Sequence, residues 1–369
     1  MIPLTDLRRQ HEALAESIEA GVLEVLRSQR LILGEHVARF ESEARQFLGA
    51  EDAIGVSSGS DGLVLSLLDA GIGPGDEVIT TPLTFVATAE AICRVGATPV
   101  FADVEPDQLS LTRDTIERAR SERTRAVIVV HLFGHVGPLE DISDYCRERG
   151  LVLIEDAAQA FGAKVGLRSV GTFGDYGVFS FFPAKVLGGA GDGGLVVARA
   201  ERGSRLRQLR VHGHVGDGEF EKVSGNYRLD AIQAAVLSAK LPHVPRFLSD
   251  RRAHAEAYEQ GLSQVKARLE LPRQRTGTTS AWNYYVVRTP DAPELVRGLK
   301  ERGVTATGYY WTPLHRQRCF AGRARATSLE ISERVAPQLV ALPLFPELTQ
   351  DERETVIRSV SDLVGERPA

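Results

Sequence analysis

The segment FSFFPAKVLGGAGDGG, residues 179–194, places one lysine between an aromatic, apolar stretch and a run of glycines. Two interpretations of Lys185 are open. Its stem could pack against apolar neighbours while its ammonium group reaches water. Alternatively, its amine could form a Schiff base with a carbonyl compound such as pyridoxal phosphate (PLP), once desolvation or a nearby cation lowers its pKa. The glycines after Lys185 would then let the backbone pass close to a ring.

Acidic and amide side chains that could serve such chemistry follow an apolar run. The segment LVLIEDAAQAFG, residues 151–162, places Glu155, Asp156 and Gln159 at the end of an expected strand. Ligands of open α/β sheets bind at the carboxyl ends of the strands. Either acid could merely cap a helix. A carboxylate there could instead keep a pyridine nitrogen protonated, which makes a PLP ring a better electron sink.

Two further segments fit a phosphorylated aromatic ligand. In GVSSGSDGLVLSLL, residues 55–68, a Ser/Gly loop leads into a helix near Asp61, and the free N–H groups of a helix start suit a phosphate. A plain tight turn explains the same glycines. In TPLTFVATAEAI, residues 81–92, Phe85 follows an expected strand and could either stack on a ring or pack in the core.

The elements that must position these side chains alternate along the chain. Residues 1–50 are expected to be helical, with apolar residues such as Leu14 and Ile18 at helical spacing. Seven short apolar runs then read as strands covered on both faces, which predicts an α/β fold with a mainly parallel seven-stranded sheet. These runs are residues 53–57, 77–80, 98–101, 126–130, 151–155, 176–182 and 194–198.

The character of the sequence changes near residue 245. The segment LPHVP, residues 241–245, carries two prolines, and the residues after it suggest a smaller α+β unit with a strand near 282–289 and a helix at 292–303. We therefore expect a large domain over residues 1–245 and a small C-terminal domain over residues 246–369.

Composition excludes several classes of function. The net charge of −5 gives no bulk attraction to nucleic acid or to a membrane surface. The start of the chain lacks the order of a signal peptide, and no apolar run reaches the roughly 18 residues of a membrane helix. Cys93, Cys146 and Cys319 show neither metal spacing nor a disulfide framework. These features predict a cytoplasmic protein with no metal, no nucleic-acid partner and no membrane partner.

The ordered motifs resemble those of one family along essentially the whole chain. The sequence is similar to the DegT/DnrJ/StrS family of sugar aminotransferases, PLP enzymes of the aspartate-aminotransferase fold (fold type I). The resemblance implies a homodimer with shared active sites, L-glutamate/2-oxoglutarate as the donor pair, and a nucleotide-linked keto sugar as the acceptor in a ping-pong cycle. The motifs are IPLTDL, GPGDEVITTPLTFVATAEAI, GATPVFADVEP, VHLFGHVGPLEDI, LIEDAAQAFGA, FSFFPAKVLGGAGDGG, GNYRLDAIQAA, PLHRQ and LPLFPELT.

The resemblance also assigns roles to individual residues. Lys185 matches the Schiff-base lysine, Asp156 the acid that faces the pyridine nitrogen, and Gln159 the partner of the ring 3-hydroxyl. Phe85 matches the stacking aromatic. The residues that match phosphate contacts are Gly59, Ser60, Asp61, Ser180 and, from the other subunit, Asn226.

The substrate-contact segments depart from the family pattern. Many members carry a Lys/Arg-Tyr-x-His segment where this chain has Gly218, Glu219 and Phe220, and Tyr309 and Trp311 replace a frequent His and Pro. The chemistry is therefore expected to follow the family more closely than the substrate does. The expected substrate contacts are Arg228, Tyr309, Tyr310 and His315.

Asp192 bears on which carbon of the sugar is aminated. In the resembling enzymes a Glu is usual at this place in those that aminate C4, and an Asp is common in those that aminate C3. We therefore expect a 3-keto sugar linked to UDP or, second, to dTDP, with a 4-keto sugar as the alternative. A uronic acid needs a cation or several donors for its carboxylate. Arg228 could supply the cation, whereas the neutral phenol of Tyr309 weakens that option and leaves it open.

Other functions remain as alternatives. In a sugar dehydratase branch of the family a histidine replaces the lysine, so Lys185 argues against that activity. A non-enzymatic regulator would not need the complete set of cofactor residues. The basic clusters at 118–125 and 202–210 are read as solvated helix faces, or as a source of one arginine for a diphosphate.

Overall fold

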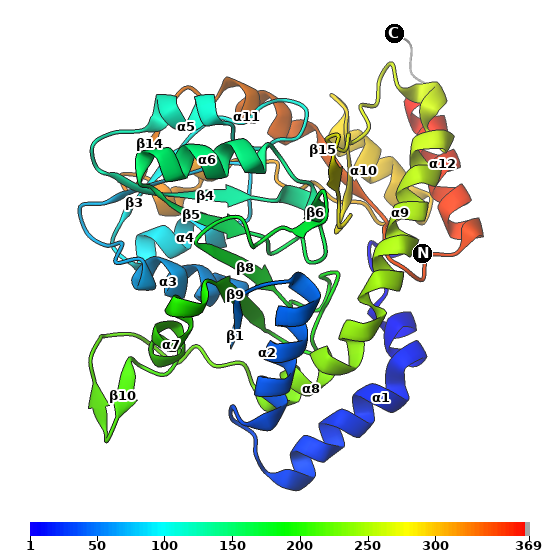
Figure 1. Ribbon diagram of the computed structural model, residues 1–369. Coiled ribbons are helices and arrows are strands. Elements are labelled where there is room, and N and C mark those ends of the chain that lie inside the picture. Colours follow the sequence, from blue (N-terminus) through cyan, green and yellow to red (C-terminus); the bar gives the residue numbers. More distant parts are fainter. Residues whose placement is uncertain (366–369) are drawn as a thin grey trace.

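A computed structural model describes residues 1–365, and its centre is an eight-stranded sheet (Figure 1). The strand order is β1-β9-β8-β5-β4-β2-β3-β14. All seven apolar runs form strands, as predicted, but the expected count of seven is one too low, because the short strand β14 pairs with β3 at the edge. The strands are β1 (Asp52–Val56), β2 (Glu77–Thr80), β3 (Thr98–Phe101), β4 (Thr124–Val130), β5 (Val152–Asp156), β8 (Tyr176–Ser180), β9 (Gly194–Ala198) and β14 (Arg325–Ala326).

The sheet is mainly parallel, and one strand reverses it. Neighbours from β8 across to β14 are parallel, whereas β9 runs antiparallel to both β1 and β8. In this register Gly194, the first residue of β9, lies opposite Val56 and Ser180, the last residues of β1 and β8. The start of β9 therefore reaches the carboxyl edge of the sheet, where the loops after β1 and β8 begin.

Helices bury both faces of the sheet. Along β4, Val127 and Val129 belong to one apolar core, whereas Ala126 and Ile128 belong to another. The first core is covered by α1 (Leu7–Ser28), α2 (Glu35–Leu48), α5 (Arg113–Ala119), α6 (Leu139–Arg149) and α8 (Ala231–Lys240). The second is covered by α3 (Gly59–Asp69), α4 (Ala87–Arg94) and α7 (Ala200–Leu209).

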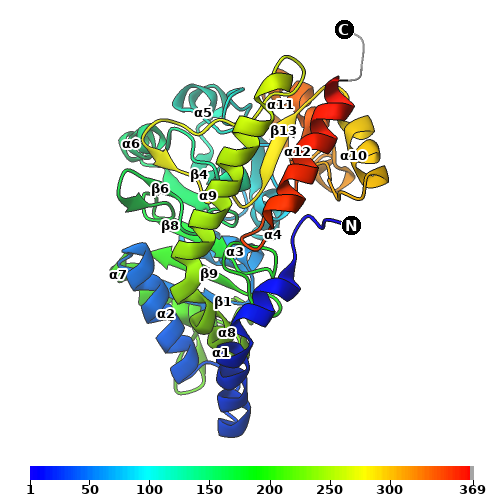
Figure 2. The ribbon, with the colours of Figure 1, turned by 90° about the vertical axis from the view of Figure 1, so that its right-hand side faces the viewer.

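The C-terminal part of the chain has its own apolar core. Strand β13 (Tyr285–Arg288) pairs antiparallel with β15 (Leu339–Leu342), and α10 (Ala292–Glu301) and α12 (Gln350–Gly365) pack beside them. The long helix α9 (Val244–Gly261) runs along the molecule from the large sheet to this part (Figure 2). The boundary expected near residue 245 falls where α8 passes into α9 through the turn Leu241–His243, and the division into two domains stays a prediction.

Smaller elements lie around the large sheet. A three-stranded sheet contains β6 (Lys164–Val165), β7 (Arg168–Ser169) and β12 (Thr278–Thr279). The hairpin of β10 (His214–Gly216) and β11 (Glu219–Phe220) projects from the body next to α7 (Figure 1). Helix α11 (Glu330–Val335) precedes β15. Among residues 1–365 no helix is long and apolar enough to cross a membrane.

Candidate active site

A cavity of about 410 Å³ opens at the carboxyl ends of the central strands. Its walls come from the segments that follow β1, β2, β4, β5 and β8, from Asp192 shortly before β9, and from Tyr284, Tyr309 and Tyr310 of the C-terminal part. The structure therefore gathers, from segments far apart in sequence, most of the predicted site. The predicted residues that line it are Gly59, Ser60, Phe85, Asp156, Gln159, Ser180, Lys185, Tyr309 and Tyr310, together with Asp192.

Asp156 is a buried carboxylate at the end of β5. The Thr88 hydroxyl donates to its Oδ2 at 2.7 Å, and the Ala158 N–H donates to its Oδ1 at 3.2 Å. Burial raises the pKa of Asp156, while the bond from Thr88 and the charge of Lys185 oppose that rise. The carboxylate can therefore hold a cationic group in the cavity as an ion pair.

Glu155 has a different role because successive residues of a strand point to opposite faces. Its carboxylate accepts from the N–H groups of Gly171, Phe173 and Gly174 and contacts His131 Nε2 at 3.1 Å. Of the two adjacent acids only Asp156 lines the cavity, and Glu155 holds a loop.

The amine of Lys185 has the environment of a nucleophile. Burial lowers the pKa of Lys185 to about 8, although the charge of Asp156 acts in the opposite direction. Among the described residues, the amine has no carboxylate ion-pair partner. A substantial fraction of neutral amine is therefore present at mildly alkaline pH, as attack on a carbonyl carbon requires.

The start of α3 has the groups that an anion site needs. Ser58 caps the helix by accepting from the Asp61 N–H, and Gly59 packs against Ser180 of β8. The first N–H groups of a helix lack intrahelical partners and carry a positive partial charge. The Asp61 carboxylate turns away, because it accepts from Ser57 and pairs with Arg94. The backbone of Gly59 and Ser60, with the Ser180 hydroxyl, can therefore hold a phosphate.

The glycines after Lys185 approach protein atoms. A Cβ on Gly194 would lie 2.5 Å from the backbone of Ser58, and one on Gly189 would lie 2.7 Å from Gln233 Oε1 on α8. The glycines were expected to let the backbone pass close to a cofactor ring, but they also allow close contacts within the protein. Gly194 lets β9 contact the start of α3, and Gly189 lets the loop contact α8.

An aromatic wall completes the cavity. Phe85 is 56% exposed, so its ring faces open space. The Gln159 side chain accepts from the Phe133 N–H and donates to the Tyr310 hydroxyl at 3.2 Å. Tyr310 lies 6.3 Å from Phe85 and 5.3 Å from Tyr309, measured between ring centroids.

Four predicted residues do not line this cavity within one chain, namely Asp61, whose carboxylate turns away, and Asn226, Arg228 and His315. Asn226 is exposed and forms a backbone bridge with Val211, and Arg228 bridges the backbone of Val56. His315 contacts Glu333 at 2.9 Å. Their roles remain predictions.

Sequence reasoning missed Thr88, His131 and Tyr284, which all line the cavity. Thr88 lies four residues after Thr84 in the segment TPLTFVATAEAI, and the two hydroxyls are 2.9 Å apart although only Thr88 belongs to α4. His131 directly follows β4 and shares its edge of the sheet. No sequence signal singles out Tyr284, because it comes from the C-terminal part.

The fold and this site define a class of protein, the PLP enzymes of fold type I. A cradle for a phosphate, an exposed phenyl face, a buried carboxylate and a buried amine of lowered pKa lie in one cavity, and together they fit PLP. When bound, PLP supplies an electron sink for the carbon that carries the amino group.

The comparisons then give the family. The profile of the DegT/DnrJ/EryC1/StrS aminotransferase family matches residues 12–361, so the chain belongs to that family and is a PLP-dependent aminotransferase.

Three similar proteins illustrate the range of the family. A UDP-N-acetyl-3-dehydro-alpha-D-glucosamine 3-aminotransferase of Acidithiobacillus ferrooxidans is 39% identical over 95% of both chains. A pleiotropic regulatory protein of Geobacillus stearothermophilus is 39% identical over 98% of both chains. The crystal structure of S. venezuelae DesV in complex with a ketimine intermediate superposes with a TM-score of 0.96 at 37% identity, covering 100% of this chain and 99% of that chain.

Proposed function

We propose that this enzyme transfers an amino group from L-glutamate to a 3-keto sugar linked to a nucleoside diphosphate, with UDP ahead of dTDP. The observation that carries the proposal is the shared cavity of Lys185, Asp156 and Asp192. The A. ferrooxidans relative, which is named for a UDP-linked 3-dehydro sugar, supports the choice of substrate.

In this proposal Lys185 and Asp156 carry the chemistry. The Lys185 amine would hold the cofactor covalently and, once free, would be the group that moves a proton to and from the donor α-carbon. The Asp156 carboxylate would keep the ring nitrogen protonated, and the bonds from Thr88 and Ala158 favour this role because they stabilise the charged form of Asp156. Phe85 would stack on the ring, and Gln159 would contact its 3-hydroxyl.

The sugar contacts are expected from Tyr309, Tyr310, Arg228 and His315. Among the described residues that line the cavity there is no arginine, and the two tyrosines offer neutral donors. A neutral N-acetyl sugar therefore suits this wall better than a uronic acid does.

The test is reverse transamination with 2-oxoglutarate against a panel of UDP- and dTDP-linked 3-amino and 4-amino sugars. We expect the highest kcat/KM for a UDP-linked 3-amino sugar. Lys185→Ala should bind PLP and lose turnover by a factor of about 10³ or more, as expected for a covalent catalyst. Preference for a 4-amino sugar would establish the alternative regiochemistry, and near wild-type turnover by Lys185→Ala would refute its role.

A regulatory function is the second candidate, because a 39% identical relative is named as a regulatory protein. The two functions differ in a simple measurement. The aminotransferase should show a visible band of bound PLP that L-glutamate bleaches. A purified protein that takes up no PLP would favour the regulator.

We also propose a homodimer in which each active site uses residues of both chains. Leu23, Leu26, Leu31 and Ile32 are exposed within ten residues at the end of α1, as expected of a surface that another chain covers. The exposed Asn226 would reach the phosphate of the partner site.

Subunit mixing tests the shared site. Dimers that combine Lys185→Ala with a severe Asn226 variant should regain part of the activity, because one of their two sites has both wild-type residues. Absence of recovery after confirmed subunit exchange would show that each site is built within one chain.

A further inference from the structure

Two side chains of α8 contact the loop that joins Lys185 to Asp192. The ammonium of Lys240 donates to the Gly188 carbonyl at 2.6 Å. The side-chain oxygen of Gln233 accepts from the Ala190 N–H at 2.8 Å. Both contacts fall within the glycine run that follows Lys185.

Lys240 is an unusual residue to bury for packing alone. It is 6% exposed, and burial lowers its pKa to about 8. Among residues 1–365 no carboxylate forms an ion pair with it, and Glu347 acts on it only through space. Burial of a charge is unfavourable in free energy unless hydrogen bonds compensate for the lost water, so an apolar side chain would fill the same space with a smaller desolvation penalty. Compared with an apolar side chain, lysine adds the hydrogen bond to the Gly188 carbonyl.

The glycines of the loop allow Gln233 to approach closely. A Cβ on Gly189 would lie 2.7 Å from its Oε1, and a Cβ on Gly191 would lie 3.0 Å from its Nε2. The loop therefore approaches α8 at four consecutive residues, Gly188 to Gly191.

Helix α8 is a fixed support for these contacts. Its apolar residues Ala234, Ala235 and Leu237 are buried in the core that α1 and α2 cover. The helix then continues through the turn Leu241–His243 into α9. A loop attached to α8 is thus attached to the most extensively packed face of the large sheet.

We propose that Lys240 and Gln233 are positioning residues, which anchor the loop 186–192 to α8 and thereby hold the Lys185 amine and the Asp192 carboxylate in the cavity. The inference rests on the proposed function of Lys185. It adds a reason for the glycine run that is independent of the cofactor.

The first measurement is amide hydrogen exchange of the cofactor-free protein, followed by mass spectrometry. In Lys240→Met, exchange in peptides that cover residues 186–193 should rise at least tenfold, while peptides from β4 and β5 keep the wild-type rate. Lys240 bonds a carbonyl and no amide, so faster exchange there reports a loosened loop. Lys300→Met is the matched control, because Lys300 is exposed on α10.

Kinetics give the second measurement. In Lys240→Met the Lys185 amine should be displaced, which should lower kcat of the half-reaction with L-glutamate by about 10- to 100-fold while KM changes little. Misplacement of a catalytic group by about 1 Å has effects of this size. Lys240→Arg, which keeps a donor, should recover part of the loss.

Either of two results overturns the proposal. One is wild-type exchange at residues 186–193 in Lys240→Met, and the other is an equal rise throughout the large sheet, which would mean a general loss of stability. If Lys240→Met does not fold, Gln233→Leu replaces it. Because Gln233 bonds the Ala190 N–H directly, exchange is then compared at residues 186–189, and wild-type exchange there overturns the proposal. The exchange result does not depend on catalysis, so it is separate from failure of the Lys185→Ala test.

Discussion

At the residue scale, a short chain of hydroxyl groups supports the ionised form of Asp156. An ionised carboxylate only accepts hydrogen bonds, so the Thr88 hydroxyl must donate its single proton to Asp156 Oδ2. The neighbouring Thr84 hydroxyl, 2.9 Å away, must then donate to Thr88. The two threonines therefore act in one direction and stabilise the charged form of Asp156 against the effect of burial.

Thr88→Val should weaken PLP binding by about tenfold at neutral pH, because a buried hydrogen bond to a charged group is worth about 1.5–3 kcal/mol. Removal of this bond raises the pKa of Asp156 further. As pH falls, the loss of PLP affinity should therefore begin at a higher pH than in the wild type. Titration of the apoenzyme with PLP across pH measures both effects.

Thr84→Val is the graded comparison, since it removes only the second bond of the chain and should have a smaller effect. Equal PLP affinity of Thr88→Val and wild type at every pH would show that Thr88 does not support Asp156.

At the element scale, the reversed strand β9 shapes the phosphate cradle. Because β9 is antiparallel to β1 and β8, its first residue reaches the edge where α3 starts. Gly194 allows that contact, since a Cβ would lie 2.5 Å from the Ser58 carbonyl carbon and 2.7 Å from the Gly59 nitrogen. Both are backbone atoms, which cannot move aside as a flexible side chain can.

Gly194→Ala should therefore lower the free energy of unfolding by about 2 kcal/mol through overpacking and weaken PLP binding by more than about tenfold. Denaturant unfolding and PLP titration measure the two effects. Gly73→Ala is the control, because its Cβ would meet only the Val95 carbonyl, at 3.7 Å, and we expect a change below about 0.5 kcal/mol. If Gly194→Ala were destabilised but bound PLP with full affinity, the contact of Gly194 with Ser58 would not be needed for phosphate binding.

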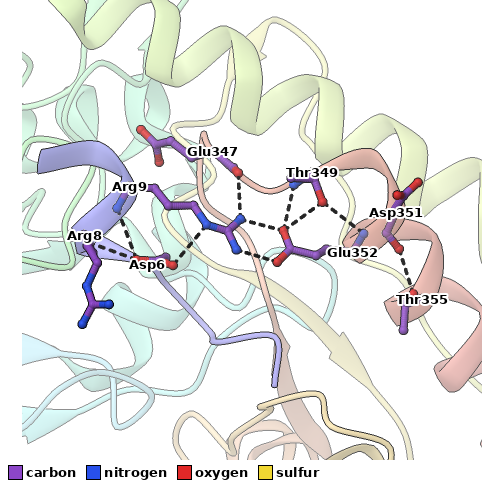
Figure 3. A network of polar contacts seen from close by, with 8 residues as sticks. All are labelled: Asp6, Arg8, Arg9, Glu347, Thr349, Asp351, Glu352 and Thr355. Carbon is purple, nitrogen blue, oxygen red and sulfur yellow. Dashed lines mark hydrogen bonds and ion pairs between the residues drawn. The ribbon is translucent and has the colours of Figure 1, made fainter. Parts of the chain in front are cut away.

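At the scale of the whole molecule, the N-terminal segment ties the two parts of the chain together. Ile2 pairs with Val304 of the C-terminal part, whereas α1 packs on α8. Between them, Arg9 binds both carboxylate oxygens of Glu352 at 2.7 Å and the Glu347 carbonyl at 3.2 Å (Figure 3). The hydrogen bonds from Arg9 hold the pKa of Glu352 at about 2.

This pair predicts a stability contribution that depends on pH. The pKa of Glu352 is lower in the folded state than its ordinary value of 4.5, so the contribution is complete above about pH 4.5 and is lost as pH falls towards 2. Glu352→Gln should lower the free energy of unfolding by about 1 kcal/mol at pH 7, and the difference from wild type should shrink below pH 4.5.

Denaturant unfolding at pH 7 and pH 3 checks this. Glu354→Gln is the matched control, because Glu354 is exposed on the same helix and contacts only Gln350. A difference between wild type and Glu352→Gln that is the same at both pH values would contradict the assignment of the contribution to ionised Glu352.

Several features of this protein could be predicted from the sequence because they depend on local patterns. Continuous β-branched runs such as 126–130 indicated strands buried on both faces, and all seven became strands. The motif around Lys185, with Asp156 and Gln159 after a strand, indicated the cofactor and the family. These predictions hold because a short stretch of chain is enough to indicate a buried strand and the side chains at its carboxyl end.

The tertiary structure alone decided the features that depend on contacts between distant segments. The two-residue strand β14 is exposed and has no apolar pattern, so only its pairing with β3 makes it a strand. The side chain of Thr88 bonds Asp156, 68 residues away, and that of Lys240 bonds Gly188, 52 residues away. Each residue is ordinary in its own segment. The physical reason is that a hydrogen bond is short and directional, so its partner is chosen by packing and cannot be read from spacing along the chain.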